Sequence, residues 1–227
     1  MKILAIECTH QVACVAVNNG SAVFEGVNGD WQKSAEAIVP LVMQVMNEAG
    51  VSPAELDGVA VSAGPGSFTA LRIGMSAAKG IAYGAGCPLA PVSTLLAMAV
   101  SACFQTDSRC IVPVIPSRAG EFFYAVYSRS AAGSGVFTEV VNGRCMAVDL
   151  AARLEPFDGD VAIPVRDVAG LVSYASELAA FCVEATLFSA ATLLPMAEAD
   201  LARGPAAELR DASPDYRQIF VPLQKKQ

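Results

Sequence analysis

A glycine-rich turn between an apolar strand and a helix of small residues constrains the fold of this chain most. Residues 64–74 read Gly-Pro-Gly-Ser-Phe-Thr-Ala-Leu-Arg-Ile-Gly, and they follow an apolar run at residues 56–62. The free backbone N–H groups of such a turn, at the positive end of a helix, often hold a phosphate. Here no lysine follows before Lys79, and Thr69 stands where a dinucleotide motif has its third glycine. The turn therefore lacks both standard phosphate motifs.

The segments around this turn predict strands alternating with helices. Apolar runs at residues 2–8, 12–17 and 22–27, with Asn18-Asn19-Gly20 before the third, predict an antiparallel meander. The tail from residue 205 is expected to be irregular, with an apolar anchor at residues 219–221.

The first helix is expected over residues 34–49, with Ser34 as its N-cap and Gly50 as its stop. Pro40 inside this range predicts a kink or an irregular first turn. The remaining expected elements are helices at residues 69–83, 93–104, 146–154, 173–180 and 190–202, and strands at residues 87–92, 110–115, 122–128, 135–141 and 161–164.

This order predicts an α/β fold in which mixed sheets are flanked by helices. A meander followed by alternating helices and strands is also the pattern of the actin/hexokinase/Hsp70-like (ASKHA) fold. We expect two subdomains, an N-terminal one at residues 1–105 and a degenerate C-terminal one at 106–227. The helix at 190–202 is expected to pack back on the first of them.

The composition indicates that part of the surface is covered by a partner. Hydrophobic residues make up 54% of the chain and charged residues only 16%, which leaves few charges to coat a monomer. The helix at 34–49 carries Val39 and Met43 outside its apolar face, and the helix at 69–83 is rich in small residues that permit close helix approach.

Several classes of protein are disfavoured by the same sequence. A net charge of −7 does not suit a main nucleic-acid surface. The uncharged stretch between Lys79 and Asp107 is broken by glycines and prolines, so no membrane span is expected. Seven cysteines without Cys-x-x-Cys spacing indicate reduced thiols and a cytoplasmic protein. The single histidine, His10, has no partner for a metal site.

Three motifs together resemble the TsaB (YeaZ) family. They are the start Met-Lys-Ile-Leu-Ala-Ile-Glu-Cys-Thr, the run at residues 64–74, and Arg118-Ala119-Gly120-Glu121-Phe122-Phe123. The resemblance is strong in the first half of the chain and weak in the rest. It implies a non-catalytic subunit of the bacterial machinery that makes N6-threonylcarbamoyladenosine in tRNA, with no cofactor, metal or catalytic residue of its own.

The catalytic paralogue of that family, TsaD, shares the fold and holds a metal with two histidines one helical turn apart. In this chain that register falls on Thr94 and Met98, and neither suits such a metal. The sequence therefore disfavours the catalytic paralogue.

The resemblance further implies docking through the first two helices. The implied partners are a TsaD-like catalytic subunit, a TsaE-like ATPase, a second copy when the protein is alone, and tRNA only through the complex, with no membrane. Some of the candidate contact residues could instead be core, and Arg72 could cap carbonyl groups or pair with Glu36. The candidates are Ile38, Leu41, Val42, Val45, Arg72, Met75, Lys79 and Tyr83.

The chain departs from the family pattern at three places. The first two departures count against a role in nucleotide binding, and the third does not affect it. Glu7 replaces an aspartate, Pro116-Ser117 replaces Asp-Ala, and Ala70 replaces a glycine. One alternative is a small-molecule or acyl-phosphate kinase-like enzyme of the same fold that uses Glu7. Another is a protease built on Ser67, Cys8 and His10, for which no oriented base is evident.

Overall fold

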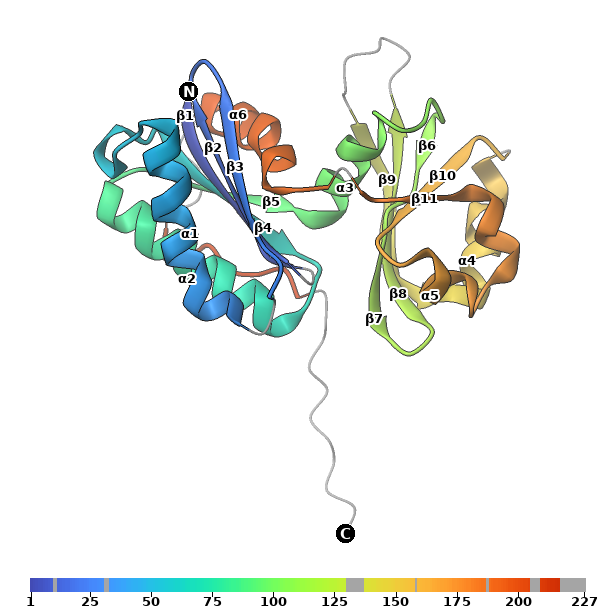
Figure 1. The fold of residues 1–227 in the computed structure, drawn as a ribbon. Helices are drawn as coiled ribbons and strands as arrows, with labels where there is room; N and C mark the ends of the chain where they lie inside the picture. The colour runs from blue at the N-terminus through green and yellow to red at the C-terminus, as the bar shows by residue number, and fades with distance from the viewer. Residues whose placement is uncertain are drawn as a thin grey trace.

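The computed structural model describes residues 1–9, 12–30, 33–129, 137–157, 159–186, 188–204 and 209–216. Figure 1 shows two sheets that lie beside each other, each with its own helices, and α3 (Thr94–Ala102) between them. We call the sheet formed by β1–β5 and its helices the first lobe, and the sheet formed by β6–β11 and its helices the second lobe. The predicted fold class, two mixed sheets flanked by helices, is confirmed.

The first sheet has five strands in the order β3-β2-β1-β4-β5. The meander is antiparallel, as predicted, and the two later strands run parallel to β1. β1 and β2 are buried almost throughout, because helices cover both faces of this sheet, whereas the edge strand β3 alternates in exposure. The strands are β1 (Lys2–Glu7), β2 (Ala13–Asn19), β3 (Val23–Asn28), β4 (Gly58–Gly64) and β5 (Leu89–Ser93).

Helices α1 (Ser34–Ala49) and α2 (Phe68–Ala85) cover one face of this sheet, and α6 (Leu194–Ala202) contacts β1, β4 and β5 from the other face. α1 ends at Gly50 in the left-handed conformation, as predicted, and continues through Pro40 without interruption. Its N-cap is Lys33, one residue before the predicted Ser34.

The second sheet has the order β11-β10-β6-β8-β7, and β9 pairs with the other edge of β8. β8 shows why the sheet is buried on both faces. Phe122, Tyr124 and Val126 point into a core with α4 and α5, whereas the alternate residues Phe123 and Ala125 pack towards α3. The elements are β6 (Cys110–Ile111), β7 (Val114–Arg118), β8 (Glu121–Arg129), β9 (Phe137–Met146), β10 (Val161–Val165), β11 (Cys182–Glu184), α4 (Ala147–Leu154) and α5 (Val168–Val172).

Three expected elements differ from the structure. The strand expected at 110–115 is two strands, because Pro113 between them cannot donate a ladder hydrogen bond. The helix expected at 173–180 is replaced by α5 and a short 3₁₀ helix at Ser176–Phe181. The segment 190–202 begins as a 3₁₀ helix, and α6 follows with a proline in its first turn. The subdomain boundary at residue 105 stays a prediction.

Among the described residues, no helix is both long enough and apolar enough to cross a bilayer. The expected anchor at residues 219–221 and the start of the strand expected from residue 135 lie outside the described residues.

Candidate docking surface and interlobe ion pair

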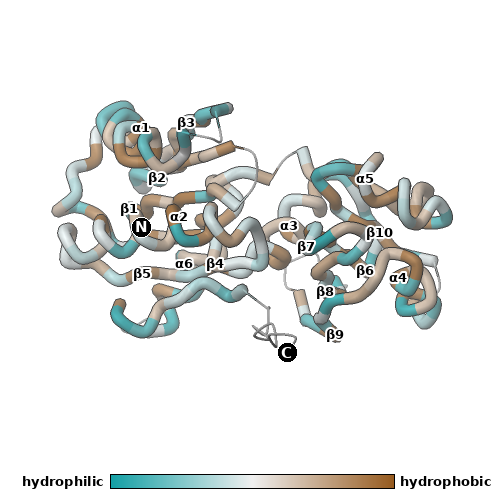
Figure 2. Tube along the Cα trace, turned by 90° about the horizontal axis from the view of Figure 1, so that it is seen from below, coloured by the Kyte–Doolittle hydropathy of each residue, from teal (hydrophilic) through white to brown (hydrophobic). Residues whose placement is uncertain are grey.

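A shallow groove runs between α1 and α2 on the outer side of the first lobe. Its volume is about 490 Å³. Val39 and Met43 on α1 are 49% and 62% exposed, and Tyr83 on α2 is 82% exposed. Figure 2 shows hydrophobic as well as hydrophilic stretches along these helices. The groove is lined by Ala35, Ile38, Val39, Arg72, Ile73, Ser76 and Ala77.

The four contact residues predicted on α1 belong to the protein's own core. Ile38, Leu41, Val42 and Val45 are buried against the sheet, and only Ile38 also lines the groove. The 3.6-residue helical period places these four residues on one side of α1, and this side packs against the sheet. The outward side of α1 carries Val39 and Met43 instead. Leu41, Val42 and Val45 therefore offer no side chain to this groove, and the role of the four residues as partner contacts stays a prediction.

Helix α2 divides its predicted contact residues between core and surface. Met75 is buried in the core, whereas Tyr83 is exposed. Gly80 and Gly84 follow Ile73 and Ala77 at helical spacing, and no atom lies within 4 Å of where their Cβ atoms would be. This side of α2 is therefore open to close approach. We call the surface formed by Ala35, Val39, Met43, Ile73, Ser76, Ala77, Gly80 and Tyr83 the α1/α2 face.

Arg72 and Lys79 contact the C-terminal segment at residues 209–216. The Arg72 guanidinium lies 3.9 Å from the centre of the Phe68 ring, and its Nε donates to the Tyr216 hydroxyl at 3.1 Å. The Lys79 Nζ donates to the Arg210 carbonyl at 3.4 Å. Both charged groups are therefore already engaged within the chain.

The sequence analysis missed this C-terminal segment as a structural element. Leu209 and Ala212 pack into the first core, and the Asp215 N–H donates to the Ala63 carbonyl at 2.6 Å. The Phe68 and Tyr216 rings have their centres 4.9 Å apart. The spacing of Leu209 and Ala212, three residues apart, was the only signal in a segment otherwise expected to be irregular.

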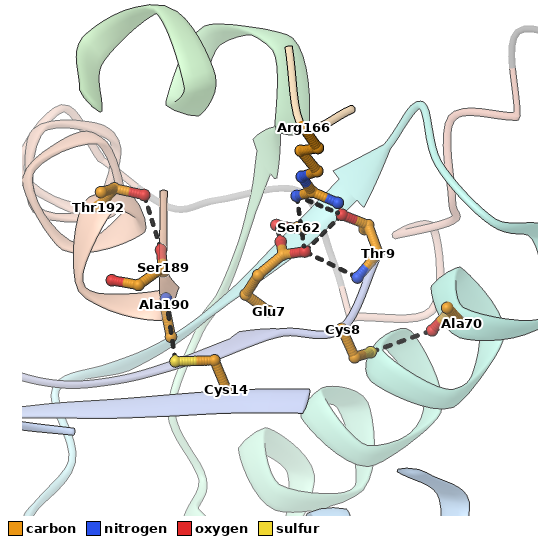
Figure 3. A network of polar contacts seen from close by, with 10 residues as sticks. All are labelled: Glu7, Cys8, Thr9, Cys14, Ser62, Ala70, Arg166, Ser189, Ala190 and Thr192. Atoms are coloured by element: carbon orange, nitrogen blue, oxygen red, sulfur yellow. Dashed lines mark hydrogen bonds and ion pairs between the residues drawn. The ribbon is translucent and has the colours of Figure 1, made fainter. Parts of the chain in front are cut away.

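A buried ion pair joins the two lobes. Glu7 lies at the end of β1, and Arg166 directly follows β10. The Glu7 carboxylate accepts a hydrogen bond from the Arg166 Nη2 at 3.3 Å. The exposed fractions of these side chains are 3% and 8%. Glu7 also accepts from the Thr9 N–H at 2.7 Å and from the hydroxyls of Thr9 and Ser62 (Figure 3). The sequence indicates Glu7 as a candidate residue but does not indicate Arg166. The pattern that could have identified Arg166 is a charged residue directly after an apolar strand.

Two opposing effects act on Arg166. Burial lowers the pKa of its guanidinium, and the neighbouring Glu7 carboxylate acts to raise it. One face of the guanidinium lies 4.4 Å from the centre of the Phe188 ring. Cavities of about 200 Å³ and 440 Å³ flank the ion pair, and each is lined by residues of both lobes.

The residues of the protease alternative do not form a reactive site among the described residues. Burial raises the pKa of the Cys8 thiol to about 12, and its Sγ donates to the Ala70 carbonyl at 3.1 Å. A thiol of this kind is a poor nucleophile, because the thiolate is the reactive form. His10 lies outside the described residues.

The positions that would carry the metal of the catalytic paralogue are part of the core. Thr94 and Met98 on α3 are fully buried. In the described part of the chain, no three His, Cys, Asp or Glu side chains come close enough together to hold a metal ion.

Comparison with known proteins identifies the fold and the family. A family model described as TsaD, tRNA N6-adenosine threonylcarbamoyltransferase, matches residues 31–154. A solved structure described as an uncharacterized protein with similarity to peptidase YEAZ from Pseudomonas aeruginosa has a TM-score of 0.84, is 22% identical, and covers 96% of this chain and 99% of its own. YeaZ from Pseudomonas aeruginosa has a TM-score of 0.78 at 21% identity, over 94% of this chain and 100% of its own.

Sequence relatives agree with the structural neighbours. The Escherichia coli tRNA threonylcarbamoyladenosine biosynthesis protein TsaB is 34% identical over 62% of each chain. An uncharacterized protein of Mycobacterium tuberculosis is 30% identical over 87% of this chain and 83% of its own. The chain spans 62% of the length of the Escherichia coli TsaB protein and 37% of that of the Haemophilus influenzae one.

The two lobes therefore define an α/β protein of the ASKHA class. The chain belongs to the TsaB/YeaZ family, as its motifs indicated.

Proposed function

We propose that this protein is a non-catalytic scaffold and activator subunit in the synthesis of N6-threonylcarbamoyladenosine in tRNA. Its partners would be a TsaD-like catalytic subunit and a TsaE-like ATPase, with tRNA bound only through the complex. The names of the TsaB relatives support the pathway. The burial of Thr94 and Met98, neither of which is a histidine, supports an accessory role.

The observation that carries the docking proposal is the open α1/α2 face. Val39 and Met43 expose apolar side chains beside a shallow groove, and small residues of α2 line part of this groove. Small residues allow two helix backbones to approach closely, and apolar side chains at such a contact lose water on association. A helix of the partner suits this surface, because Gly80 and Gly84 leave room for a second helix backbone beside α2.

Val39→Glu tests the docking. Val39 is half exposed, so the variant should fold, whereas a charge at Val42 or Met75 would disrupt the core. A charge buried at an interface without a partner is costly. We expect affinity for the TsaD-like subunit to fall at least ~10-fold, measured by isothermal titration calorimetry.

Val148→Glu is the matched control, because Val148 is an exposed valine on α4 in the second lobe. This variant should bind the catalytic subunit like the parent chain. If Val39→Glu folds and retains full affinity, the α1/α2 face is not the docking surface.

The kinase-like alternative needs Glu7 to face a ligand. Here the Glu7 carboxylate accepts from Thr9, Ser62 and Arg166. These contacts favour the accessory role. Calorimetry of the isolated chain with ATP and magnesium separates the two, since tight binding would support the enzyme.

A further inference from the structure

The contact between Glu7 and Arg166 differs from the other ion pairs of the described residues. Glu7 belongs to the first lobe and Arg166 to the second, and more than nine-tenths of each side chain is buried. The remaining described pairs include at least one side chain exposed by a fifth or more. Water screens exposed pairs, so among the described ion pairs this one is the least screened.

The ion pair is held from several sides. Donors from β4 and from Thr9 satisfy the Glu7 carboxylate (Figure 3). The Arg166 guanidinium lies over the Phe188 ring. The pair stands between the two interlobe cavities, and Arg166 lines both of them.

Thr9 connects the ion pair to the turn that starts α2. The Thr9 hydroxyl accepts from Arg166 Nη2 at 3.2 Å. The Thr9 side chain also packs so closely on Gly66 that a Cβ at Gly66 would lie 2.8 Å from the Thr9 Cβ. A displacement of Arg166 would therefore shift Thr9 and, through Thr9, the turn before α2.

We propose that Glu7 and Arg166 form an internal latch, which holds the two lobes in a closed arrangement. The latch also fixes the turn at residues 64–67 through Thr9. It acts in the isolated chain and does not depend on the proposed function.

Three variants test the latch: Arg166→Met, Glu7→Gln and the double variant Glu7→Gln/Arg166→Met. Each single change leaves a buried charge or dipole unpaired, so we expect the melting temperature to fall by on the order of 10 °C. The double variant should recover part of that loss, because no unpaired charge remains.

The readout specific to a latch is the arrangement of the lobes. Small-angle X-ray scattering should show a broader distance distribution for Arg166→Met and for the double variant than for the parent chain. Hydrogen exchange should also be faster in peptides that cover residues 7–9 and 64–68. Arg166→Lys keeps the charge and should retain the closed arrangement, even though it loses the planar stack on Phe188.

Arg109→Met is the control, because Arg109 forms an exposed pair with Asp160 within the second lobe. It should change neither the scattering nor the exchange. The latch is refuted if the double variant folds with the scattering and exchange of the parent chain, whatever its melting temperature.

Discussion

Gly64 combines an unusual backbone conformation with a close backbone contact. Its φ is +119°, and a Cβ on this residue would lie 2.3 Å from the Asp215 carbonyl oxygen. Only glycine fits both conditions, since other residues rarely adopt this φ. Gly64, the first glycine of the turn, thus allows the C-terminal segment to pack closely against the turn.

Gly64→Ala should therefore destabilise the chain by about 3 kcal/mol, from backbone strain and the displaced C-terminal segment. Urea unfolding followed by circular dichroism measures the change. Gly29→Ala is the control, because nothing lies within 4 Å of its Cβ position and its φ is not in the left-handed region. If the two variants are equally stable, Gly64 has no special role.

The thiols of Cys8 and Cys14 should be unreactive in the folded protein. Burial raises the pKa of each to about 12, so almost no thiolate exists at pH 8. The partly exposed Cys87, Cys103 and Cys182 should react first with a disulfide reagent, and mass spectrometry of the labelled peptides identifies them. Labelling of Cys8 at native pH without unfolding would contradict this assignment.

At the scale of elements, α1 and α2 each have one stripe for the sheet and one for the surface. On α2 the outward stripe is made of small residues, and a side chain added there meets nothing in the isolated chain. The effect on folding and the effect on docking can therefore be measured separately.

Gly80→Leu should leave the stability of the isolated chain unchanged or slightly higher, because leucine has a better helix propensity by up to about 1 kcal/mol. The same change should block the approach of a partner helix and lower affinity for the TsaD-like subunit ~10-fold or more. Thermal melting and calorimetry on one preparation measure both effects. Undiminished affinity would mean that partner helices do not approach this part of α2.

At the scale of the whole molecule, we expect the isolated chain to form a homodimer through the α1/α2 face. Without its partner, the exposed Val39 and Met43 favour pairing with a second copy. Met43→Glu should shift sedimentation towards the monomer, whereas Met146→Glu, at an exposed methionine of the second lobe, should not. A dimer that persists in Met43→Glu would place self-association elsewhere.

Some secondary-structure elements follow from the local sequence pattern, and others do not. The antiparallel meander, the C-terminal end of α1 at Gly50 and the mixed sheets follow from hydrophobic period and turn residues. The division of the strand at Pro113, the 3₁₀ segments and the Lys33 N-cap were missed, because one-residue effects decide them.

Ile38, Leu41, Val42 and Val45 pack into the core of the first lobe, because an apolar residue on an amphipathic helix belongs by default to its own core. The residues that remain on the surface, Val39 and Met43, were visible as apolar positions outside that stripe. They were noted in the sequence but not selected as contacts.

The α/β class, the family and the absence of a histidine pair were determined by the sequence itself. These properties depend on local pattern and on residue identity at single positions. Only the tertiary structure decided that Glu7 meets Arg166, 159 residues away, and that Tyr216 packs against Phe68. Such pairings join segments distant in the chain, and no local period encodes which of them meet.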